Sequence, residues 1–132
     1  MSNRTALLID DEAYFRHFVG EILRRNLITT VIEARDGEEA ITLFEQHKPD
    51  FVLLDINMPR KDGIETLIEL RNISAEVPIV MLTSVADEVI VEQCVEHGAS
   101  YFLRKDIPAH EMLSELKSVL ADLFVNPEPP SE

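Results

Sequence analysis

The chain has 132 residues, 45% of them hydrophobic, which suits one globular domain with a single core. Acidic residues outnumber basic ones 25 to 12, and the net charge of −13 argues against a domain that binds nucleic acid or an anionic membrane. Cys94 is the only cysteine, which excludes an intrachain disulfide, and no apolar run is long enough to span a membrane. We therefore expect a cytoplasmic protein in which Cys94 is a small buried side chain.

Short apolar runs alternate along the chain with longer segments whose apolar residues recur at helical spacing. Strands are predicted at residues 5–9, 29–33, 51–54, 77–82 and 100–103. Helices are predicted at 13–26, between Gly37 and Pro49, from Ile64 to Ser74, and at 85–97 and 109–124. We expect Phe15 in the apolar stripe of the first helix, Leu113 in that of the last, and Gly98 as the left-handed residue that ends the fourth. This alternation predicts an α/β fold, a doubly wound five-stranded parallel sheet with right-handed crossovers. Residues 1–125 are expected to form the domain, and the Pro-rich, acidic residues 126–132 a tail or linker stub.

The run KPDFVLLDINMPRKDG, residues 48–63, has the features of a central strand followed by a functional loop. Its apolar residues 51–54 do not alternate with polar ones, as in a parallel strand covered on both faces. Asp55 follows at the carboxyl end, where open α/β sheets place their ligands. Pro59 and Gly63 are turn residues, Gly63 being expected for its access to positive φ. Asp55 is thus a candidate nucleophile or metal ligand, or else a carboxylate that only caps the strand.

A second acidic cluster, Asp10-Asp11-Glu12, follows the first predicted strand. The carboxyl ends of two strands in one parallel sheet meet at the same edge, so Asp10, Asp11 and Asp55 should lie together. Neighbouring carboxylates repel one another, and their oxygens suit a hard divalent cation that needs few protein ligands. The second cluster therefore favours a functional Asp55.

Four motifs occur in a fixed order: Asp10-Asp11 after the first strand, Asp55 in DINMPRKDG, Thr83-Ser84 after VPIVML, and Lys105 after Phe102-Leu103-Arg104. Together they resemble the receiver domain of the response-regulator family of two-component signalling. The resemblance runs from about Thr5 to Phe124, nearly the whole chain. It implies the flavodoxin-like, CheY-like strand order 2-1-3-4-5.

The resemblance implies a signalling switch rather than an enzyme that turns over a substrate. Asp55 would accept a phosphoryl group from a phosphohistidine on a histidine kinase or phosphotransfer protein. Mg²⁺ is implied at the side chains of Asp11 and Asp55 and at the carbonyl of Asn57, with Asp10 acting mostly through water. The phosphoryl group and the metal would thus share one cluster of carboxylates.

The resemblance also assigns roles to three residues of the last two strands and the loop that follows. Lys105 would pair with a phosphoryl oxygen, and Thr83 would donate a hydrogen bond to the phosphoryl group. Phe102 would turn inward when Thr83 moves. The alternatives are an ordinary surface lysine, a plain strand-end threonine and a core or half-exposed aromatic. Because Asp106 follows Lys105 where many receivers have proline, we expect no cis peptide there.

The implied output is a change in the face formed by the fourth predicted helix, the last strand and the last helix, which would bind a downstream protein or a second copy of the chain. Val89, Ile90 and Val91 follow one another in that helix, and successive helical residues are rotated by about 100°. One buried stripe cannot cover all three. At least one of them should therefore be exposed.

A different class of protein also uses a strand-terminal aspartate with Mg²⁺, the phosphatases of the haloacid-dehalogenase type. Those enzymes carry a second aspartate two residues after the nucleophile, which serves as acid and base. Asn57 occupies that position here, which argues against phosphatase turnover. A third reading is a degenerate receiver that only binds proteins, and the intact set of Asp10, Asp11, Asp55, Thr83 and Lys105 argues against it.

Overall fold

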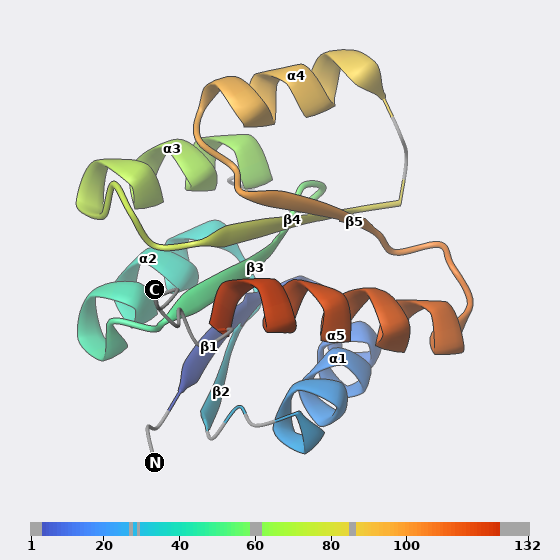
Figure 1. The fold of residues 1–132 in the computed structure, drawn as a ribbon. Helices are drawn as coiled ribbons and strands as arrows, with labels where there is room; N and C mark the ends of the chain where they lie inside the picture. The colour runs from blue at the N-terminus through green and yellow to red at the C-terminus, as the bar shows by residue number, and fades with distance from the viewer. Residues whose placement is uncertain (1–3, 27, 29, 59–61, 85–86, 125–132) are drawn as a thin grey trace, which may run out of the picture.

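The five predicted strands form one parallel sheet in the order β2-β1-β3-β4-β5 (Figure 1). The structure, a computed structural model, describes residues 4–26, 28, 30–58, 62–84 and 87–124. The strands are β1 (Thr5–Ile9), β2 (Thr30–Ala34), β3 (Phe51–Asp55), β4 (Ile79–Thr83) and β5 (Tyr101–Arg104). The predicted doubly wound topology is confirmed. The proposed tail, residues 126–132, lies outside the described residues.

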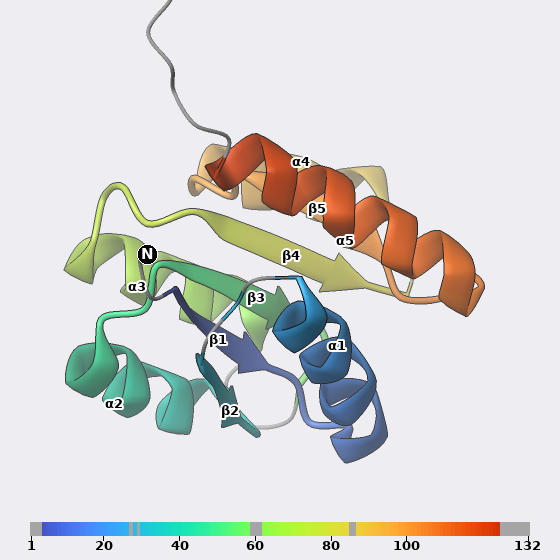
Figure 2. The ribbon, with the colours of Figure 1, turned by 60° about the horizontal axis from the view of Figure 1, so that its bottom comes forward.

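Helices cover both faces of the sheet (Figure 2). One face packs against α1 (Ala13–Arg25) and α5 (Ala109–Phe124). The other packs against α2 (Gly37–His47), α3 (Gly63–Ile73) and α4 (Glu88–Glu96). Successive strand residues point to opposite faces, so Leu8 joins the first core and Leu7 the second.

The central strands of the sheet are the most deeply buried, as their unbroken apolar runs predict. Every residue of β3 and β4 is buried. The edge strands β2 and β5 each keep exposed residues, among them Glu33 and Arg104. Cys94 is buried as predicted, and Val89 is 62% exposed, which confirms that one residue of the apolar triplet faces solvent.

Three helices begin at an aspartate whose side chain accepts a hydrogen bond from a backbone N–H of the first turn. Asp36 caps α2, Asp62 caps α3 and Asp87 caps α4, each at 2.9 Å. The Asp87 cap corrects the prediction that the fourth helix starts at residue 85, because an extended, capping residue cannot lie inside a helix. Val85 and Ala86 lie outside the described residues.

Two further predictions concern helix faces and ends. Leu113, expected in the buried stripe of α5, is 38% exposed, and Val119 takes its place in the core because it lies on the side that faces the sheet. Gly98 has φ +95 just after α4 and ends that helix in the left-handed conformation, as predicted. The part of the chain that the structure describes has no cis peptide bond, in agreement with the expectation at Lys105-Asp106.

Candidate functional site

Three carboxylates meet at the carboxyl edge of the sheet. Asp10 follows β1 directly, and Asp55 ends the neighbouring β3. One oxygen from each of Asp10, Asp11 and Asp55 lies within 4.8 Å of the others. The prediction that these side chains come together is confirmed. Their chemistry fits a hard divalent cation, because each offers a carboxylate oxygen and Asp11 is exposed to solvent.

The loop after Asp55 is held against the strand by Gly63. The Gly63 N–H donates to the Ile56 carbonyl at 2.8 Å. A Cβ on Gly63 would lie 2.3 Å from the Asp55 carbonyl oxygen and 2.5 Å from the Ile56 Cα, far inside van der Waals contact. This residue therefore has to be glycine for lack of space, which corrects the expectation that it was needed for a positive φ.

Asp10 is fully buried and held on several sides. Its carboxylate accepts hydrogen bonds from the Glu12 N–H and from the Lys105 ammonium, both at 2.8 Å. Its backbone carbonyl accepts one from the Arg16 guanidinium at 2.7 Å. Since Arg16 also pairs with Glu33 of β2 at 2.9 Å, the turn after β1 is tied to the neighbouring strand.

Lys105 enters the site from the loop after β5. Its backbone N–H donates to the Thr83 carbonyl at 2.8 Å, which continues the pairing of β4 and β5. The ammonium bonds to Asp10 and to Glu12, and lies 3.6 Å from the Asp55 carboxylate. The ring of Phe15 lies beneath it, 4.6 Å from the nitrogen to the ring centroid. These contacts exclude the alternative of an ordinary surface lysine.

The protonation of the carboxylates reflects burial and their mutual repulsion. Burial, and after it the negative charge of Asp10, raises the pKa of Asp55 from its ordinary 3.8 to about 7, against the attraction of Lys105. Burial also raises the pKa of Asp10, although Lys105 and the Glu12 N–H favour its charged form. Burial favours the neutral amine of Lys105, but hydrogen bonds to Asp10 and Glu12 outweigh this and raise its pKa.

A cleft of about 480 Å³ opens over this cluster. Asp11, Asp55, Asn57 and Lys105 line it, so four of the predicted site residues share one cavity. The Asn57 N–H lies 3.3 Å from an Asp55 carboxylate oxygen, which places this residue beside the cluster. The cleft can therefore admit a small anionic group between a lysine and a carboxylate.

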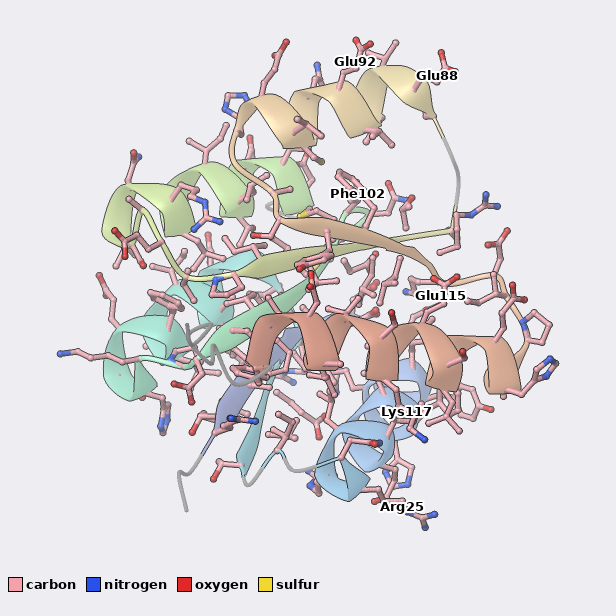
Figure 3. The ribbon with its side chains drawn as sticks, in the orientation of Figure 1. Arg25, Glu88, Glu92, Phe102, Glu115 and Lys117 are labelled. Carbon is pink, nitrogen blue, oxygen red and sulfur yellow. The ribbon has the colours of Figure 1, made fainter. Side chains whose placement is uncertain are left out.

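Thr83 and Phe102 occupy two different parts of the molecule. Thr83 ends β4, is buried, and directly follows Leu82, the residue paired with Asp55. Phe102 pairs with Met81 inside the sheet and is partly buried against the second core. Its side chain lies between α4 and α5 (Figure 3). The predicted switch residues are thus on adjacent strands, one at the carboxylate edge and one at a side groove.

A sequence model of the response regulator receiver domain matches residues 6–117, most of the chain. The chain belongs to the receiver domain family. Receiver domains are regulatory phosphoacceptors, so the chain is a phosphorylation-dependent switch of the response-regulator type. The comparisons give no support to the phosphatase alternative.

The receiver resembles both short and longer proteins. It is 33% identical to the chemotaxis protein CheY of Bacillus subtilis over 86% of the chain and 95% of that protein. It is 37% identical to the transcriptional regulatory protein PdtaR of Mycobacterium tuberculosis, over 86% of the chain but 55% of that protein. A CheX–CheY complex with BeF₃ and Mg²⁺ from Borrelia burgdorferi superposes with a TM-score of 0.80 at 28% identity, covering 89% of each chain.

No helix among the described residues is both long and apolar enough to cross a membrane.

The lining of the receiver's cleft includes Glu12, Phe15 and Ser84, to which the sequence analysis assigned no role in the site. Glu12 accepts the second hydrogen bond from Lys105, and its place directly after Asp11 was the only available signal. Phe15 was assigned only to the apolar stripe of the first helix. Helical spacing alone cannot tell whether such a ring only fills the core or also lies beneath the Lys105 ammonium. Ser84 lines the cleft one residue after Thr83.

Proposed function

We propose that Asp55 is the phosphoacceptor of this receiver. The observation that carries the proposal is the position of its carboxylate, which is 4% exposed, lies 3.6 Å from the Lys105 ammonium and belongs to the cluster with Asp10 and Asp11. Among these three aspartates, Asp10 already uses its oxygens for Lys105 and the Glu12 N–H. Asp11 lines the same cleft but is exposed to solvent and forms no ion pair with Lys105. Asp55 is therefore a buried carboxylate that lines the cleft and has the Lys105 ammonium nearby.

The reaction is transfer of a phosphoryl group between two nucleophiles. An Asp55 carboxylate oxygen attacks phosphorus of a phosphohistidine on a histidine kinase or phosphotransfer protein. The new O–P bond forms an acyl phosphate as the N–P bond breaks, and the imidazole leaves with the electron pair. Lys105 would pair with a phosphoryl oxygen, because its ammonium lies next to Asp55 and its raised pKa keeps it charged. The Thr83 hydroxyl would hydrogen-bond the same group.

Mg²⁺ is the cation that this set of ligands suits. The side chains of Asp11 and Asp55 and the carbonyl of Asn57 would hold it, with Asp10 acting through water because Lys105 and the Glu12 N–H occupy its carboxylate. When bound, Mg²⁺ would supply positive charge to the phosphoryl oxygens.

The face formed by α4, β5 and α5 is proposed to bind the downstream partner, either another protein or a second copy. A groove of about 670 Å³ runs between β5 and α5, with Phe102 in its lining, and Val89 and Val95 of α4 are exposed. Thr83 connects Asp55 to this face, since it ends the strand that pairs with β5. Phosphorylation would act by favouring the conformer in which Thr83 and Phe102 have moved.

Intact mass spectrometry after incubation with acetyl phosphate and Mg²⁺ tests the acceptor. Wild type should gain one phosphoryl group, and Asp55→Asn none. Asp87→Asn is the matched control, because asparagine can keep the cap of α4 and the residue lies outside the cleft. Phosphoryl uptake by Asp55→Asn equal to that of wild type would place the acceptor elsewhere.

Hydrogen exchange tests the proposed output face. Phosphorylation should change the protection of amides in 88–104 in the wild type, and Thr83→Ala should take up the phosphoryl group without this change. Sedimentation with and without acetyl phosphate then shows whether Val89→Asp and Phe102→Ala weaken self-association. A phosphorylation response confined to α2 or α3 would contradict this assignment of the face.

A further inference from the structure

A basic cleft lies at the end of the molecule opposite Asp55. Its volume is about 290 Å³, and its lining comes from the residue just before β1, the end of α1 and the last two turns of α5. Arg4, Arg25 and Lys117 are the charged residues in the lining. In Figure 3, Lys117 lies on the side of α5 that faces α1, and Arg25 at the C-terminal end of α1. No lining residue is acidic, in a chain with 25 acidic residues.

Two of these cations lack a carboxylate partner among the described residues. Most basic side chains among the described residues, such as Arg16, Arg35 and Arg104, form ion pairs. Within the described part of the chain, Arg4 and Lys117 form none, and Arg25 has only a loose pair with Glu21 at 3.9 Å. The cleft therefore concentrates positive charge that the fold itself does not neutralise.

The lining beneath the cations is apolar and fixed. Phe124 packs edge-on against Phe51, with 5.5 Å between ring centroids, and the Arg4 guanidinium lies 4.3 Å above the Phe124 ring. Leu120 is buried beside them. Such a cleft suits a carboxylate carried by a chain with apolar side chains, because the carboxylate meets the cations and the rest covers the rings.

The segment that leaves this cleft has that chemistry. Phe124 lines the cleft and is the last described residue, and residues 125–132 follow it in the sequence. Their sequence VNPEPPSE holds two glutamates, three prolines, one valine and no cation. Glu128 is four residues beyond Phe124, a reach of roughly 13 Å when extended, enough to span a cleft of this size. The prolines lower the entropy lost on binding.

The other groove beside α5 repels the same segment. Its charged lining residues, Glu115 and Asp122, are both acidic, whereas Glu88 and Glu92 lie on the side of α4 that faces away from α5 (Figure 3). Like charges would disfavour an acidic segment there. We propose that residues 125–132 bind back in the basic cleft, with Glu128 pairing with Arg4, Arg25 or Lys117, and so stay off the face proposed for partners. This contact does not depend on which residue accepts the phosphoryl group.

Paramagnetic relaxation enhancement tests the proposal on the full chain. A nitroxide is attached at Ser131→Cys, where it reacts selectively because Cys94 is fully buried. The amide signals of Arg25, Asn26 and Lys117 should lose most of their intensity, while those of Glu88 and Phe102 keep theirs. Salt at about 1 M, where the screening length is roughly 3 Å, should restore the lost signals.

Neutral variants separate charge pairing from mere proximity of the two ends. Arg4→Gln/Lys117→Gln should restore the signals of Arg25 and Asn26, and so should Glu128→Gln. Lys48→Gln, which removes an exposed cation at the end of α2, should leave the broadening unchanged. The proposal is wrong if the cleft amides keep full intensity, if Glu88 and Phe102 broaden as strongly, or if the broadening survives both the salt and the double variant.

Discussion

The Lys105 ammonium lies 3.6 Å from the Asp55 carboxylate, close enough to attract it and beyond hydrogen-bond distance. Its hydrogen bonds go to Asp10 and Glu12 instead. One cation thus faces three carboxylates, and Asp55 bears the less neutralised charge of the two buried ones, because the ammonium hydrogen-bonds to Asp10 and not to Asp55. This imbalance has consequences for stability, metal binding and pH dependence.

Replacing Lys105 should destabilise the protein. Lys105→Gln leaves the buried Asp10 without its ionic partner, and we expect the free energy of unfolding at neutral pH to fall by about 2–4 kcal/mol. Urea denaturation measures the loss. The loss should be clearly smaller in an Asp10→Asn background, because the pair is then already broken. Lys117→Gln, at an exposed position, should change stability by less than about 0.5 kcal/mol. Equal effects of the two lysine replacements would contradict a structural role for the Lys105–Asp10 pair.

Two glycine replacements should have opposite signs. Gly63→Ala places a Cβ 2.3 Å from the Asp55 carbonyl oxygen, so backbone has to move, and unfolding should become easier by about 1–3 kcal/mol. Gly20→Ala in α1 meets the flexible end of Arg24 at 3.2 Å and Val31 at an ordinary 3.8 Å, and should gain up to about 1 kcal/mol from helix propensity. Chemical denaturation of both variants checks the difference. Gly63→Ala should also slow phosphoryl uptake, since the backbone that has to shift belongs to Asp55 and Ile56.

Magnesium should raise the melting temperature through the three carboxylates. At a concentration tenfold above Kd, binding stabilises the folded state by about 1.4 kcal/mol, a shift of a few degrees for a chain of this size. Asp11→Asn removes an exposed ligand without touching the Lys105–Asp10 pair and should abolish most of the shift. Glu38→Gln, on the surface of α2, is the control that should keep it. A full shift in Asp11→Asn would exclude Asp11 as a ligand.

Without divalent cations, stability should fall as the pH rises toward neutrality. Asp55 has a folded-state pKa of about 7 against 3.8 in the unfolded chain, so the folded state binds the extra proton in this range. The stabilisation from this proton is complete below the unfolded pKa and is lost as the pH rises through about 7, with a slope of at most roughly 1.4 kcal/mol for each pH unit. Unfolding in EDTA across this range measures the slope. Asp55→Asn should flatten it, leaving the part due to Asp10 and surface repulsion. A slope unchanged in Asp55→Asn would show that Asp55 does not titrate there.

The sequence by itself determined the fold and the meeting of three carboxylates at one edge of the sheet. Unbroken apolar runs such as 51–54 and helical spacing in segments such as 109–124 are local patterns, and each follows from which faces must be buried. Asp10 and Asp55 could be placed together because parallel strands end at a common edge. The order of the strands came from the family resemblance, which the sheet confirms.

Only the tertiary structure decided how distant residues meet. Lys105 and Asp10 are 95 positions apart, and no local pattern tells which of three carboxylates the ammonium will bind. Gly63 looked like a turn residue, but glycine is required there because the backbone of Asp55 packs against it and leaves no space for a Cβ. The basic cleft joins Arg4, Arg25 and Lys117 from three elements whose side chains share a surface only once α1 and α5 pack on the same face of the sheet. Periodicity reports burial within one element, whereas contacts between elements depend on how they pack.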